Sequence, residues 1–129
     1  MTRVTLEAGT VLYHGVQQNV FDQNDLYPPG EISLPAWFSR DVQVARRFAR
    51  RGPVRAYRLE EAVSLQVISS SAEFRALLNE YDLGDGTPEE IVEGLPGEFF
   101  GWIVPDNYGP GSDDLLLGVQ TQLEFEREI

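Results

Sequence analysis

The chain of 129 residues contains no cysteine, no lysine and only one histidine, His14. The absence of cysteine excludes disulfides, thiolate metal sites and a cysteine nucleophile. The absence of lysine excludes Schiff-base chemistry. A single histidine gives little support to a histidine-based metal site or to a catalytic triad with a spare base, so we expect no metal.

Several motifs of nucleotide-binding and hydrolytic enzymes are also missing. The sequence has no GxSxG, no GxGxxG and no phosphate-binding loop that ends in Gly-Lys. No run of about 18 apolar residues occurs, and the first ten residues lack the apolar stretch of a signal peptide. We therefore expect a cytoplasmic protein that makes no membrane contact. Delivery elsewhere by a route without a signal peptide stays open.

Positive charge is scarce and unevenly distributed. The net charge is -11, all ten basic residues are arginine, and seven of them lie within residues 40–58. Residues 1–58 carry eight arginines and five acids (+3), whereas residues 59–129 carry two arginines and 16 acids (-14). The overall charge makes nucleic acid an unlikely partner. The arginine-rich part can bind a small anion such as a pyrophosphate, or it can be a solvated helix face.

Length and residue patterns predict one α+β domain over residues 1–129. The chain is 42% hydrophobic, with no repeat and no low-complexity tract. We expect a long loop at 17–33 and helices at 41–50, at 71–80 behind a Ser70/Glu73 capping box, and after Thr87. The expected strands are a first strand at 10–16 that ends at Gly15, a short segment at 34–39, half-buried alternating strands from Val54 and from Ser64, a pair at 99–104 and 114–119, and a last segment at 120–126.

Three segments in order, LYHG (12–15), WFSRDVQVARRFA (37–49) and the chain from 99 to 125, resemble the ADP-ribosyltransferase superfamily. The resemblance is to the branch whose first motif is histidine, which includes poly(ADP-ribose) polymerases and RNA 2'-phosphotransferases. It implies two small, mainly antiparallel sheets with a few short helices. It also implies NAD as co-substrate, release of nicotinamide, and transfer of ADP-ribose to a protein, to a small molecule or to water. Of these acceptors we expect a protein, as for toxin-like members of the family.

The first motif places Tyr13, His14 and Gly15 at the cofactor. By the resemblance, His14 hydrogen-bonds a ribose hydroxyl of NAD, and the backbone of Gly15 contacts the nicotinamide amide. An amide needs a donor and an acceptor close by, and a residue without a Cβ lets the main chain approach.

The second motif is aromatic. The resemblance assigns stacking on nicotinamide to Trp37 and places Phe38 and Ser39 beside it. For Phe38 a core position is the favoured interpretation. Ser39 can contact the ligand or cap the following helix, and its position before a helix start favours the cap. In that helix, Ala45 and Phe48 recur at helical spacing and are expected to be packing residues.

The third motif places Asp114 where the family has glutamate, with Ser112 two residues earlier. A carboxylate there stabilises the oxocarbenium-like ribose as nicotinamide leaves. Aspartate is one methylene shorter, and a displacement of that order can cost about a hundredfold in rate. Only one of Asp113 and Asp114 is expected to face the site, because adjacent strand residues point to opposite faces. A Gln-x-Glu pattern at 122–124 is a weaker candidate.

Three functional classes stay open. The ordered motifs favour an NAD-dependent transferase. The aspartate in place of glutamate favours a module of the same fold that binds NAD, ADP-ribose or a protein without turnover. The acidic C-terminal half alone would suit a polyanion-like partner of a basic target.

Overall fold

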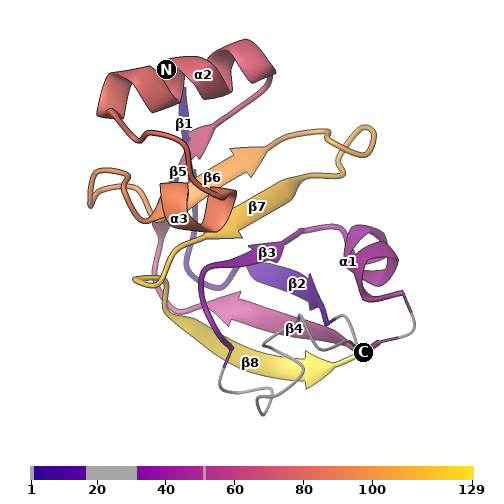
Figure 1. Ribbon diagram of the computed structural model, residues 1–129. Coiled ribbons are helices and arrows are strands. Elements are labelled where there is room, and N and C mark those ends of the chain that lie inside the picture. The colour runs from indigo at the N-terminus through magenta and orange to yellow at the C-terminus, as the bar shows by residue number, and fades with distance from the viewer. Residues whose placement is uncertain (1, 17–31, 51) are drawn as a thin grey trace.

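The structure is a computed structural model that describes residues 2–16, 32–50 and 52–129 (Figure 1). Each helix and strand expected from the sequence is present in these ranges. The helices are α1 (Val42–Ala49), α2 (Ser71–Tyr81) and α3 (Pro88–Val92). The strands are β1 (Arg3–Leu6), β2 (Val11–Gly15), β3 (Ala36–Phe38), β4 (Val54–Leu59), β5 (Val63–Val67), β6 (Gly101–Val104), β7 (Asp114–Leu117) and β8 (Leu123–Glu128).

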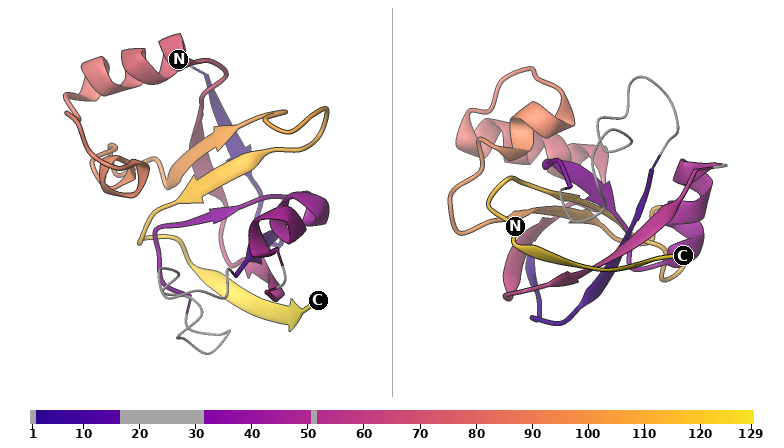
Figure 2. Two further views of the ribbon diagram at one scale, coloured as in Figure 1. Left: turned by 45° about the vertical axis from the view of Figure 1, so that its right-hand side comes forward. Right: turned by 90° about the horizontal axis from the view of Figure 1, so that it is seen from below.

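The strands form two small sheets, as expected for the α+β class. One sheet has the order β1-β5-β6-β7-β3, and the other has the order β2-β4-β8. Neighbouring strands are antiparallel except β5 and β6, which are parallel. A parallel pair needs a long crossover connection, and here α2 and α3 lie within it. In Figure 2 these two helices lie together at one end of the molecule and α1 lies at the other.

The main core lies between the two sheets. Leu12 and Tyr57 from the three-stranded sheet pack with Leu115 and Leu117 of β7. Leu116, which points to the opposite face, joins a second core beneath α2 and α3. Strand β7 is therefore buried on both faces, which explains its unbroken apolar sequence.

Helix α1 packs against β2 and the start of β4, on the face of the three-stranded sheet that points away from the main core. Its buried residues Ala45 and Ala49 pack against Val54, which confirms the packing role expected for Ala45. Its N-cap is Asp41, whose side chain accepts a hydrogen bond from Gln43 N. The expectation that Ser39 caps this helix was therefore wrong, because a residue two positions later provides the capping oxygen.

Two further expectations were wrong. The segment from Val54 was expected to be half-buried, but in β4 only Arg58 is exposed. The reason is its central position, since β2 and β8 flank it and α1 covers one of its faces. The strand at 10–16 is also not the first, because β1 precedes it and pairs with β5.

Most of the expected loop at 17–33 lies outside the described residues. Within the described part of the chain, none of the helices has the length and apolar character to cross a membrane.

Candidate functional site

Among the described residues, one pair links the two sheets by main-chain hydrogen bonds. Tyr13 N donates to Ser39 O at 2.8 Å, and Ser39 N donates to Tyr13 O at 3.0 Å. This isolated bridge joins β2, an edge strand of one sheet, to the end of β3, an edge strand of the other. We call residues 13–15 and 37–39 the fork, because β2 and β3 share one bridge within the described chain and then diverge.

Gly15 presents its main-chain N–H and C=O on the open edge of β2. Alternate residues of an antiparallel strand direct these groups to opposite sides, and Tyr13 directs its own toward Ser39. Gly15, two residues further on, therefore faces away from β4, and its partner Val54 turns its carbonyl the other way to accept from Ile129 N. No hydrogen bond from the described residues engages these groups of Gly15. The result is an adjacent donor and acceptor, as a carboxamide requires.

The glycine at position 15 also has a packing reason. A Cβ there would overlap Ala45 O and would lie 2.8 Å from Ala49 N. Gly15 thus lets α1 pack directly on β2, so its identity alone is no evidence for a ligand. The direction of its main-chain groups carries that argument instead.

His14 lies within the fork and is only 7% exposed. Its Nδ1 lies 2.8 Å from Trp37 O. A carbonyl oxygen can only accept, so Nδ1 carries a hydrogen, and in the neutral ring Nε2 is an acceptor. The ring centroid is 5.5 Å from that of Phe38, on the side of the main core.

The two aromatic residues of the second motif have different surroundings. Phe38 is 2% exposed and belongs to the main core, which confirms the core interpretation. Trp37 is half-buried on the opposite face, where its Nε1 donates to Glu89 Oε1 at 3.0 Å and its ring meets Trp102 edge-on. Trp37 therefore connects the fork to α3.

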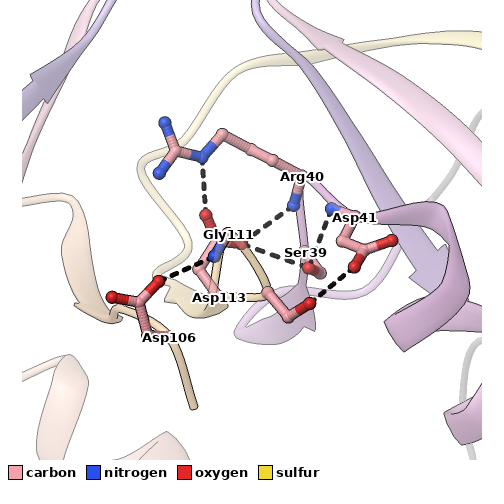
Figure 3. A network of polar contacts seen from close by, with 7 residues as sticks. Ser39, Arg40, Asp41, Asp106, Gly111 and Asp113 are labelled. Carbon is pink, nitrogen blue, oxygen red and sulfur yellow. Dashed lines mark hydrogen bonds and ion pairs between the residues drawn. The ribbon is translucent and has the colours of Figure 1, made fainter. Parts of the chain in front are cut away.

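Asp113 is fully engaged in a polar network at the start of α1 (Figure 3). Its carboxylate accepts from Ser39 Oγ at 3.1 Å, from Arg40 N at 2.9 Å and from Arg40 Nε at 2.6 Å. Ser39 Oγ also accepts from Asp41 N, and Ser112 Oγ donates to Asp41 Oδ2. Asp113 and both serines thus hold the loop 105–113 against α1.

Asp114 has a different environment from its neighbour. It is 8% exposed, Tyr108 Oη donates to its Oδ2 at 3.3 Å, and its Oδ1 is buried without a hydrogen-bond partner among the described residues. Burial raises the pKa of Asp114 to about 6, and the nearby charge of Asp113 acts in the same direction, whereas the bond from Tyr108 lowers it. A perturbed carboxyl with a spare acceptor is typical of a functional site.

Phe48 and Tyr108 complete the surroundings of Asp114 and were missed at the sequence level. Phe48 was expected to be a packing residue, but it is 37% exposed. Its helical spacing places it near the buried face of α1, but its ring meets that of Tyr108 edge to face, with the two ring centroids 5.9 Å apart. Tyr108, in a turn-rich loop, gave no sequence signal except its proximity to Asp114.

The strand register decides which of these side chains share a face. Opposed residues of antiparallel strands point to the same side. Phe38 is opposite Leu115, so Ser39 lies beside Asp114, while the bridge places Tyr13 beside Ser39. Trp37 and Asp114 therefore share the face that carries α3, and His14 points to the other face.

The remaining candidates lie apart from this face. Glu124 of the Gln-x-Glu pattern is on β8, opposite Arg58 and across the sheet from β2. Of the six clustered arginines that the structure describes, three form ion pairs with described residues, namely Arg40 with Asp113, Arg55 with Glu128 and Arg58 with Glu126. Arg46 and Arg47 lie on the exposed side of α1. The described residues contain no group of three or more side chains that could hold a metal ion.

Comparison of the chain with protein-family models, with curated proteins and with solved structures finds no match.

Proposed function

We propose that this protein binds NAD at the fork and transfers its ADP-ribose unit to an acceptor, with release of nicotinamide. The observation that carries the proposal is the main-chain donor and acceptor of Gly15, which lie at the fork on the strand beside β3 and are engaged by no hydrogen bond from the described residues. They would pair with the carboxamide of nicotinamide as a neighbouring strand would. The order of the three motifs in the sequence supports the same assignment.

The spacing of the strands suits this ligand. Neighbouring strands lie about 4.8 Å apart, so at the Tyr13–Ser39 bridge β2 and β7, with β3 between them, are separated by about 10 Å, and the separation widens toward Gly15 as β2 and β3 diverge. A pyridine ring joined to a ribose spans a similar length. With its amide at Gly15, the ribose would approach Asp114. Trp37, Phe48 and Tyr108 supply aromatic surface around that path.

Asp114 would act on the bond that breaks. The bond from ribose C1' to the nicotinamide nitrogen breaks, and its electron pair leaves with nicotinamide. The acceptor then bonds to C1' and loses a proton. Positive charge develops on the ribose in between, and the Asp114 carboxylate would stabilise it and would accept a hydrogen bond from a ribose hydroxyl.

His14 would orient the ligand without entering the chemistry. The bond between Nδ1 and Trp37 O fixes the orientation of the ring, and the resemblance assigns to this histidine a hydrogen bond with a ribose hydroxyl. The side chain of His14 lies on the face of the fork opposite to that of Asp114. The ligand would therefore pass through the fork and contact both faces.

A specific observation favours a second candidate, which is binding of NAD or ADP-ribose without turnover. The Asp114 carboxylate is short, and both of its oxygens are covered. Since misplacement on the ångström scale can abolish most of the rate, the same contacts would then give affinity alone.

The test is nicotinamide release from NAD by the purified protein and by the variants His14→Ala and Asp114→Asn. Asp85→Asn, an exposed carboxyl between α2 and α3, is the matched control. Release by the parent and the control, with loss in both site variants, supports the transferase. A thermal shift with NAD but no release supports the binding module, because a ligand of the folded state must stabilise it. If NAD causes neither nicotinamide release nor a thermal shift, both candidate functions are contradicted.

A further inference from the structure

Tyr108 occupies the hydrogen-bonding position on Asp114 that a ligand needs. Its phenol donates to Asp114 Oδ2, and a ribose hydroxyl would bring the same kind of donor to the same kind of acceptor. The other oxygen, Oδ1, is buried and has no partner among the described residues. A ligand hydroxyl can therefore reach this carboxylate only if a covering group moves.

Tyr108 is a covering group whose side chain is partly exposed. It is 38% exposed, and its side chain contacts Asp114 through the 3.3 Å hydrogen bond, the side chain of Asn107 through another hydrogen bond, and Phe48 edge-on. The loop that carries it is firmly held instead. Tyr108 N donates to Ser112 O, and Ser112 Oγ donates to the capping carboxylate of α1 at 2.7 Å.

We propose that Tyr108 is a specificity-determining residue that covers Asp114 and competes with the ligand hydroxyl for its carboxylate. The proposal rests on the proposed function for the identity of that ligand. A molecule that offers a hydroxyl to Asp114 can replace the phenol, because its own hydrogen bond to the carboxylate compensates for the bond that Tyr108 loses. A ligand without a hydroxyl cannot make this replacement. Tyr108 would thereby select for ribose-bearing ligands and exclude water from Asp114 until one binds.

The binding test uses Tyr108→Phe, which keeps the ring and removes the hydroxyl, with Tyr81→Phe at the end of α2 as the matched control. Loss of one competing hydrogen bond should tighten the Kd for NAD about fivefold. In an Asp114→Asn background, Tyr108→Phe should change the Kd by less than about twofold, because the two residues act as a pair. An unchanged or weaker Kd in the single variant would overturn the proposal.

A second measurement does not need NAD at all. Carbodiimide labelling of carboxyl groups, followed by peptide mass spectrometry, should modify Asp114 slowly in the parent and at least about threefold faster in Tyr108→Ala, with Asp85 as the internal reference. Faster labelling without any NAD binding would mean that the cover is real and the proposed ligand is wrong. Unchanged labelling would overturn the cover itself.

Discussion

Tyr13 and Ser39 exchange both of their main-chain hydrogen bonds, and this pair joins the two sheets at the fork. The residues on either side of it carry the candidate chemistry. Gly15 lies two positions beyond the bridge on one strand, and Asp114 lies beside Ser39 on the next strand of the larger sheet. The packing at this junction and the contributions of the nearby carboxylates to stability can be tested by separate substitutions.

Gly15→Ala is expected to destabilise the protein by about 1–3 kcal/mol, because the added methyl would overlap Ala45 O and force α1 away from β2. The measurement is the free energy of unfolding in urea. Gly97→Ala is the control, since a Cβ there meets nothing within 4 Å. Equal stability of the two variants would contradict the direct packing of α1 on β2.

Asp113→Asn is expected to cost about 1.5–3 kcal/mol of stability. The carboxylate accepts three hydrogen bonds, and an amide would turn a donor toward Arg40 Nε or Ser39 Oγ. Thermal and urea unfolding would measure the loss. Asp82→Asn is the matched control, since Asp82 is exposed in the left-handed conformation that asparagine tolerates. A loss no larger than that of the control would refute the anchoring role of Asp113.

Asp114→Asn is expected to stabilise the protein, unlike Asp113→Asn, and the size of the gain should depend on pH. The pKa of Asp114 in the folded protein is about 6, above its ordinary value of 3.8. Folding therefore favours the protonated carboxyl, and its contribution to stability is present below the ordinary pKa and is lost as pH rises through about 6. The variant cannot ionise at this position. Its free energy of unfolding should therefore rise relative to that of the parent by up to about 3 kcal/mol as the pH increases from about 4 to about 7.5.

Urea unfolding at both pH values would measure this gain. For Asp85→Asn the difference from the parent should stay within about 0.5 kcal/mol at each pH. A gain for Asp114→Asn that is equal at the two pH values would show that the buried carboxyl is not the cause.

Trp37 should report ligand binding through its fluorescence. The chain has two tryptophans, and Trp102 is 2% exposed in the core beneath α2 and α3, whereas Trp37 lies at the fork. NAD is expected to quench the emission of the parent and of Trp102→Phe, and to quench that of Trp37→Phe less, because Trp102 is buried and meets the ligand site only through its contact with Trp37. Quenching that is undiminished in Trp37→Phe would place the ligand elsewhere. Because Trp37→Phe also removes the bond to Glu89, it should cost about 1 kcal/mol of stability.

Local sequence alone determined the helices, most of the strands and the α+β class of this protein. The capping boxes at Ser70 and Thr87 act over three residues, and the alternating or unbroken apolar runs reflect the burial of each strand. The same local patterns correctly predicted Phe38 and Ala45 as packing residues.

Tertiary structure decided what depends on register and on contacts between distant segments. Asp113 and Asp114 are indistinguishable by local pattern, but only Asp113 meets Ser39 and Arg40 across the fold, which leaves Asp114 with Tyr108. Phe48 has the spacing of a core residue, but it is 37% exposed and meets Tyr108. Such relationships arise from how segments distant in the chain, such as β3 and β7, align, and no short-range pattern encodes that alignment.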